Sequence, residues 1–175
     1  MFNSRYLILT AMILIAAISR LIPHPPNFAP IAAIALFGGA YFSQKRFAFI
    51  VPLAALFLSD LILGLHQLMI LTYGCFVAII AIGLWLQKRR TASRIIATAF
   101  MSSVLFFVVT NFGVWMLSGM YTKNINGLMT CYIAALPFFQ NTLAGDLVYI
   151  GILFGGFAFA QKQFPALRLS TSLTH

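Results

Sequence analysis

Acidic residues are almost absent from this chain. Asp60 and Asp146 are the only two in 175 residues, and all charged residues together make up 7% of the sequence. A soluble domain carries about 25% charged residues. So low a content excludes a soluble domain and leaves no separate catalytic or regulatory module.

Cysteines and catalytic motifs are also scarce. Cys75 and Cys131 are the only cysteines, and two cysteines form neither a metal-ligand spacing nor a disulfide framework. The sequence has no P-loop, no HExxH, no GxSxG and no dinucleotide-binding fingerprint. These absences exclude an ATPase on motif grounds, and we expect no enzyme activity. Cys75 and His66 are weak candidates for a metal site, and no resident metal is expected.

Long hydrophobic runs fill most of the remaining sequence. Hydrophobic residues make up 62% of the chain, and in lipid only helices and closed barrels satisfy their backbone hydrogen bonds. Unbroken runs close to the ~20 residues that a spanning helix needs favour helices. The prediction is an all-α, polytopic membrane helix bundle, a single integral membrane domain over residues 1–175 in the bacterial cytoplasmic (inner) membrane. About six transmembrane helices are expected, at residues 6–22, 29–43, 47–65, 67–87, 94–118 and 140–161.

A further apolar stretch covers residues 127–139 and ends near Pro137. It is shorter than the run that a spanning helix needs. We expect a re-entrant or interfacial element here, in the long connection before the sixth span.

Basic residues give the chain a net charge of +9 and are distributed unevenly. With six spans and a retained first helix, only Arg20 and Lys123 lie on one side of the membrane. The other nine lie together on the opposite side: Arg5, Lys45, Arg46, Lys88, Arg89, Arg90, Arg94, Lys162 and Arg168. The positive-inside rule then places both termini in the cytoplasm. Because the basic residues mark topology, no nucleic-acid partner is expected, although the cluster 88–90 could meet acidic lipid or a cytoplasmic partner.

Polar residues from several spans share the half of the membrane that faces away from the cytoplasm. Ionisable groups at membrane depth normally face the bundle interior or a water-filled cavity. We expect an outward-facing, substrate-binding pocket lined by Arg20, His24, Asn27, Asp60, His66, Tyr73, Asn111, Trp115, Asn141 and Asp146. The aromatic residues would stack on a ring of the ligand, and the carboxylates and amides would hydrogen-bond its polar edge.

Each aspartate also has a purely structural explanation. Asp60 could pair with Arg20, and Asp146 could cap the start of the sixth span, where the helix dipole favours an anion. The proline-rich segment 21–27 is either a rigid rim of the pocket or a helix stop.

Small residues recur four apart in two of the expected spans. Ala35 and Gly39 lie in the second span, and Gly151 and Gly155 lie in the sixth. This spacing lets helix backbones approach closely. The two sites serve either internal packing or docking of another membrane protein.

Four stretches of sequence resemble a known group of proteins. Residues 20–30 read RLIPHPPNFAP, residues 36–41 LFGGAY, residues 110–115 TNFGVW and residues 135–139 ALPFF. Together they look like a bacterial family of small integral membrane proteins of unknown function.

The architecture is similar to that of substrate-binding S-components of energy-coupling factor transporters. This resemblance implies six helices with both termini inside, a vitamin bound in an outward-facing pocket, and small-residue patches that dock a transmembrane coupling subunit with its ATPases. Some S-components for cobalamin use a cysteine as cobalt ligand. Cys75 would be the candidate here, with cobalamin as one candidate transported ligand.

The predicted function is therefore a membrane substrate-binding subunit for uptake of a vitamin or similar micronutrient. Its expected partners are a small-molecule substrate, the lipid bilayer and a transmembrane coupling subunit with ATPases. Two alternatives stay open. One is a non-transport membrane scaffold or assembly protein, and the other is a proton-coupled carrier that uses Asp60 and Asp146.

Overall fold

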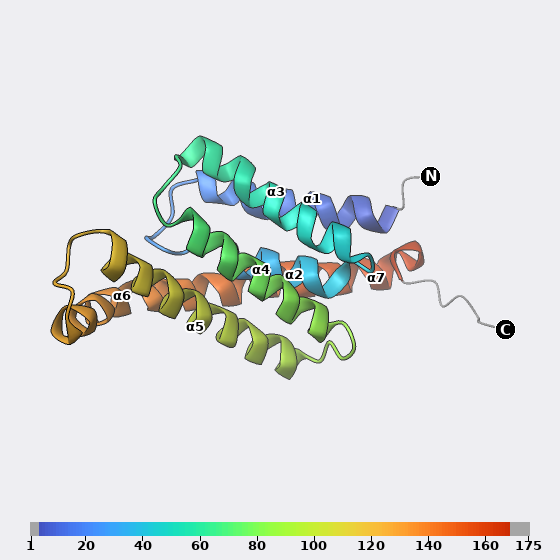
Figure 1. The fold of residues 1–175 in the computed structure, drawn as a ribbon. Coiled ribbons are helices and arrows are strands. Elements are labelled where there is room, and N and C mark those ends of the chain that lie inside the picture. Colours follow the sequence, from blue (N-terminus) through green and yellow to red (C-terminus); the bar gives the residue numbers. More distant parts are fainter. Residues whose placement is uncertain (1–3, 169–175) are drawn as a thin grey trace.

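The computed structural model describes residues 4–168, and all regular structure in that range is helical. The elements are α1 (Ser4–Ile18), η1 (Ser19–Leu21), α2 (Ile31–Tyr41), α3 (Lys45–Leu63), α4 (Met69–Leu86), α5 (Ala92–Leu117), α6 (Ile125–Ile150), the π-helical turn η2 (Gly151–Gly155), α7 (Gly156–Gln163) and η3 (Pro165–Leu167). Successive helices from α1 to α6 run in opposite directions (Figure 1). The predicted all-α bundle is confirmed.

Five helical segments in the described range are long and apolar enough to cross a membrane. They are Ser4–Leu21, Lys45–Leu63, Met69–Leu86, Ala92–Leu117 and Ile125–Gln163. The chain is therefore a multi-pass membrane protein.

The expected span at 29–43 is wrong in length. The helix there, α2, has 11 residues, which rise about 16 Å at ~1.5 Å per residue. The hydrocarbon core of a bilayer is about 30 Å thick, so α2 reaches only halfway across. The apolar composition of this segment reflects burial inside the protein rather than contact with lipid. Every residue of α2 after Ile31 is buried.

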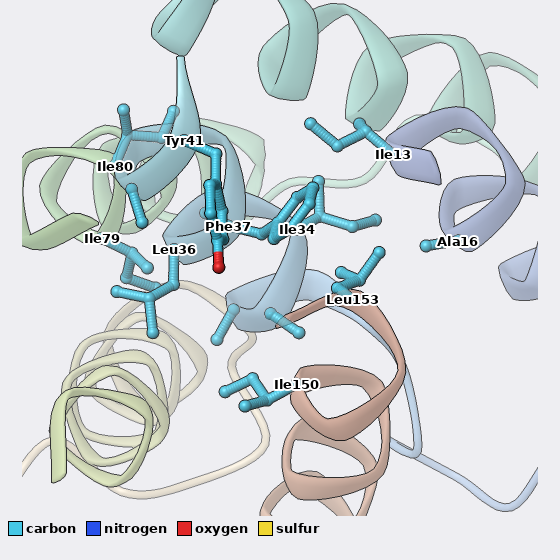
Figure 2. Packing of buried hydrophobic residues seen from close by; sticks show 14 of the residues in the cluster. Ile13, Ala16, Ile34, Leu36, Phe37, Tyr41, Ile79, Ile80, Ile150 and Leu153 are labelled. Carbon is cyan, nitrogen blue, oxygen red and sulfur yellow. The ribbon is translucent and has the colours of Figure 1, made fainter. Parts of the chain in front are cut away.

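This short helix is the centre of the bundle. It contacts α1, α3, α4, α5 and α6, and its most extensive contact is with α4. Figure 2 shows its side chains pointing toward α1, α4 and the α6–η2 segment: Phe37 lies on the side of Ile13 and Leu153, and Leu36 lies on the side of Ile79. Since lipid tails are as apolar as this core, α2 is held by close packing rather than by exclusion from water.

Glycines make the α2–α4 contact close. A methyl group added at Gly39 would overlap the carbonyl of Ile80, and one added at Gly83 would overlap the carbonyl of Leu36. The small residues of the second expected span therefore serve internal packing. Gly151 and Gly155 differ, because a methyl group added at either would meet nothing within 4 Å.

The last carbonyl groups of α2 are capped by side chains that follow α4. Gln87 Nε2 donates to the carbonyls of Gly39, at 2.8 Å, and Phe42, at 2.7 Å. Arg90 Nη1 donates to the carbonyl of Ala40 at 3.0 Å. These carbonyls have no partner within the helix, and a cation here also complements the negative end of the helix dipole.

Arg5 completes this cap and joins both ends of the described chain. Its Nη2 donates to the carbonyl of Tyr41 at 2.9 Å and its Nη1 to the carbonyl of Leu167 at 2.5 Å. The first and last described segments therefore lie at the same end of the bundle. We name it the basic end, because the nine basic residues grouped in the sequence analysis belong to segments that begin or end there.

The expected break between 127–139 and 140–161 is absent. A single helix, α6, covers Ile125–Ile150 with Pro137 in its interior. Asn124 starts it, since its side chain accepts a hydrogen bond from the amide of Gly127 at 2.9 Å. Proline is tolerated inside membrane helices because neighbouring groups compensate the lost hydrogen bond. As a result Asp146 lies deep within the helix rather than near its start.

Candidate functional site

The loop of residues 22–30 descends from the surface into the bundle. Starting from the basic end, α1 with η1 covers 18 residues, or about 27 Å at ~1.5 Å per residue, whereas α2 covers about 16 Å on the way back. The loop therefore enters α2 near the middle of the bundle (Figure 1). Irregular backbone at membrane depth occurs only where protein buries it or where it lines a water-filled cavity.

This loop is fastened to α6. Asn141 Nδ2 donates to the carbonyl of Pro26 at 3.0 Å. One helical turn later, Gly145 lets the loop approach the helix backbone: an added Cβ would lie 3.2 Å from both the amide nitrogen of Ala29 and the Cα of Phe28. A larger residue would push the loop away from α6.

An ion pair fastens the other side of the entrance. Arg20 Nη2 lies 2.8 Å from Asp60 Oδ1, and the same guanidinium donates to the hydroxyl of Ser59. The hydroxyl of Tyr73 donates to Asp60 Oδ2 at 3.0 Å. Asp60 is only 2% exposed, and a buried charge of this kind needs such a partner. The structural explanation of Asp60, pairing with Arg20, is confirmed, and its contacts link η1 to α3 and α4.

Asp146 lies at the start of α2, not at the start of its own helix. Its Oδ2 accepts a hydrogen bond from the Ser103 hydroxyl of α5 at 2.7 Å. The carboxylate also lies beside the backbone N–H groups of Ala32 and Ala33. Pro30, at the N-cap of α2, provides no side-chain cap. Asp146 therefore faces the positive end of the α2 dipole from another helix, and the expectation that it caps the sixth span is wrong.

The second oxygen of Asp146 has unused hydrogen-bonding capacity. Within residues 4–168, Oδ1 makes no hydrogen bond of normal geometry, although the side chain is 2% exposed. Buried carboxylate oxygens are normally satisfied. This oxygen is available to a hydrogen-bond donor that enters the site.

A cavity of about 240 Å³ adjoins the loop, the start of α2 and α6. We name it the outer cavity, and it is lined by Arg20, His24, Asn27, Ala29, Ile31, Ala32, Leu63, Phe106, Thr142 and Asp146. His24 and Asn27 are exposed at its rim. The volume is many times the ~10–15 Å³ that a single water needs in such a cavity, so the cavity suits a small ligand.

Four of the ten predicted site residues line the outer cavity: Arg20, His24, Asn27 and Asp146. Three more support it indirectly. Asp60 and Tyr73 position Arg20, and Asn141 holds the loop.

The other three predicted residues lie elsewhere. His66 is exposed in the loop between α3 and α4. Asn111 Nδ2 donates to the carbonyl of Phe107 in its own helix, and Trp115 Nε1 donates to the carbonyl of Thr122. None of the three is among the residues that line the outer cavity. For Asn111 and Trp115 the reason is that α5 and α6 extend beyond the other helices (Figure 1).

Six residues that line the outer cavity were not among the predicted site residues: Ala29, Ile31, Ala32, Leu63, Phe106 and Thr142. Thr142 precedes Asp146 by four residues, and residues four apart share one helix face. That spacing could have identified it. Phe106 has no such signal.

The arrangement of the described side chains does not support the hypotheses of a metal site or of cobalamin as the ligand. Cys75 is buried in α4 and is not among the residues that line the outer cavity. Over the described range, no three His, Cys, Asp or Glu side chains lie close enough to hold a metal ion. Cobalamin is also much larger than the outer cavity.

Comparison with known proteins identifies a family but no function. No curated protein and no solved structure matches the chain. A family model described as a family of unknown function, DUF6580, matches residues 1–167. The chain therefore belongs to the DUF6580 family.

Proposed function

We propose that this protein is a membrane substrate-binding subunit, similar in role to an S-component, for uptake of a small polar micronutrient. The observation that carries the proposal is the half-length helix α2, whose buried start adjoins the outer cavity. In many transporters, discontinuous helices place their N-terminal ends at substrate sites near the membrane midplane. The proline-rich loop fits the same reading, since non-helical backbone at this depth lines a cavity.

The lining suggests the chemistry of the ligand. Arg20 and the amide end of α2 attract an anionic or carbonyl group. Asp146 Oδ1 accepts from a donor such as an amine, amide or hydroxyl. A compact molecule that carries both kinds of group fits best. Phe106 is the aromatic residue in the lining, so it takes the packing role that the sequence analysis gave to Tyr73 and Trp115.

The experiment is mass spectrometry of small molecules retained by the protein after purification in mild detergent. The test variant is Thr142→Leu, which fills the outer cavity. Thr130→Leu is the matched control, because both threonines lie in α6 and donate to the carbonyl four residues earlier, at 3.1 Å and 2.8 Å. A compound present in wild type and Thr130→Leu but missing from folded Thr142→Leu supports the proposal. No compound in wild type, across several growth media, favours a scaffold protein.

One observation favours a proton-coupled carrier as the second candidate. Asp146 also borders an apolar cavity of about 140 Å³ between α5 and α6, so its carboxylate lies between two hollow regions. The ion pair of Asp60 with Arg20 makes Asp60 a poor second proton carrier. Proton-driven uptake by purified protein in vesicles, without any ATPase, would favour the carrier.

A further inference from the structure

A second hollow lies at the basic end, separate from the outer cavity. It is a groove of about 350 Å³ between the start of α5 and the η2–α7 segment, and we name it the inner groove. Its lining residues lie on α2, α5, α6, η2 and α7 or, for Arg90, just before α5. The binding of a ligand in the outer cavity does not use this groove, whereas docking of a coupling subunit is the other role open to Gly151 and Gly155.

The floor of the inner groove is apolar, and no side chains project from its two glycines. Gly151 and Gly155 lie exposed along it, and a Cβ added at either would meet nothing within 4 Å. Ile95 and Phe154 add apolar wall. The π-helical turn occupies this same segment, and such turns occur often at functional sites. The shape suits an extended hydrocarbon chain.

Polar groups are concentrated at one end of the groove. Arg90 is half-buried, its guanidinium carbon lies 4.7 Å from the ring centroid of Tyr41, and one of its nitrogens donates to the carbonyl of Ala40. In the described chain, no hydrogen bond uses its other N–H groups or the hydroxyl of Tyr41, a residue that is 7% exposed. In Figure 2 this hydroxyl points toward the side of α2 on which Ile150 lies. These donors are available to an acceptor at the mouth of the groove.

The electrostatic surroundings at this end favour an anion. Lys88 and Arg89 are exposed beside Arg90, and both carboxylates of the chain lie elsewhere, Asp60 near the opposite end and Asp146 at the start of α2. Basic pockets between membrane helices on the cytoplasmic side bind anionic lipid headgroups. Bidentate guanidinium donors match phosphate oxygens in particular.

We propose that the inner groove binds an anionic phospholipid, with its phosphate at Arg90 and Tyr41 and one acyl chain along Gly151 and Gly155. The positions of the lining residues along the bundle agree with a headgroup at the basic end and an acyl chain that extends toward the middle. Arg90 lies in the loop at the basic end, whereas Ile96 and Ile150 lie further along their helices toward the middle of the bundle. The groove suits a lipid better than a second apolar helix. Such a helix could pack on Gly151 and Gly155, but it would leave the remaining N–H donors of Arg90 without an acceptor.

The test is native mass spectrometry of the whole protein in detergent with equal amounts of dioleoyl phosphatidylglycerol and dioleoyl phosphatidylcholine. Wild type should retain the anionic lipid about fivefold better, the effect of roughly one basic residue near a headgroup. Gly155→Leu fills the groove and should abolish this preference. Gly74→Leu is the matched control, because Gly74 is also an exposed helical glycine with open space around its Cα.

A second pair of variants tests the headgroup. Arg90→Gln should lose most of the preference, whereas Lys45→Gln, an exposed lysine at the same end, should keep it. If Arg90→Gln does not fold, because Arg90 also caps α2, the Gly155 pair still decides. Equal retention of the two lipids by wild type, or an unchanged preference in Gly155→Leu, overturns the proposal. Loss of a dimer or protein partner in Gly155→Leu, with lipid retention unchanged, also overturns it and makes the groove a protein interface.

Discussion

Ser103 of α5 donates a hydrogen bond of 2.7 Å to Asp146 of α6, directly beside the start of α2. The contact connects α5 and α6 inside the bundle, where Asp146 is buried. The carboxylate that it holds lies beside the N–H groups of Ala32 and Ala33, which have no acceptor within α2, so its charge favours the start of a helix inside the bundle. Its second oxygen, Oδ1, makes no hydrogen bond of normal geometry within residues 4–168.

The first prediction concerns this carboxylate. Asp146→Leu removes the acceptor near the start of α2 and should lower stability by about 1–3 kcal/mol, the cost of leaving buried polar groups unsatisfied. Asp146→Asn keeps one acceptor oxygen and should cost less. The check is the thermal midpoint of each purified variant in one detergent. Equal midpoints for wild type and Asp146→Leu would show that the carboxylate does not hold α2.

The second prediction concerns the ion pair at the cavity entrance. Asp60→Asn leaves the partly buried Arg20 without its counter-charge and should cost about 1–3 kcal/mol, less than for a fully buried pair. The double variant Arg20→Gln, Asp60→Asn should recover part of that loss, because no unpaired charge remains. Denaturation of both variants in a fixed detergent measures the coupling. Strictly additive losses would contradict a direct interaction between these side chains.

The third prediction concerns the closest helix contact. Gly83→Ala places a methyl group against the carbonyl of Leu36 and should cost about 3 kcal/mol through overpacking. Gly74→Ala, in the same helix but facing open space, should be neutral or slightly stabilising because alanine favours helix. Thermal stability of the two variants, compared side by side, checks the packing. Similar midpoints would mean that α2 and α4 are further apart than described.

The fourth prediction concerns the opposite end of α2. Gln87→Ala removes both hydrogen bonds to the carbonyls of Gly39 and Phe42 and should lower stability by about 1–2 kcal/mol. Gln140→Ala is the control, because Gln140 is exposed near the middle of α6 and should change little. Limited proteolysis of the two variants compares their stability. Greater sensitivity of the control would contradict the cap.

The sequence predicted some of this arrangement for sound physical reasons. Arg20 and Asp60 are charged residues in apolar segments, and pairing lowers the cost of burying such charges. The uneven distribution of basic residues predicted a common end for Arg5, Lys45 and Arg90. The alternating directions followed from this, even though one predicted span was not a span.

The rest could not be read from composition. An apolar helix that is buried in protein has the same composition as one that faces lipid. Composition therefore did not show that α2 is too short to span the membrane. Pro137 reads as a helix end, yet α6 continues through it. That error displaced Asp146 toward the surface. Asn111 and Trp115 were then grouped with the cavity by depth alone, although their hydrogen bonds belong to the α5–α6 hairpin.

The central claim is a binding cavity that opens on the side away from the basic end. The most direct measurement is labelling of single-cysteine variants in intact cells with a membrane-impermeant maleimide. The native cysteines, Cys75 and Cys131, are buried and would be replaced by serine or alanine. Thr142→Cys in the outer cavity should react in intact cells, whereas Lys45→Cys, an exposed position at the basic end, should react only after the membrane is permeabilised. Labelling of Thr142→Cys only after permeabilisation would contradict the account.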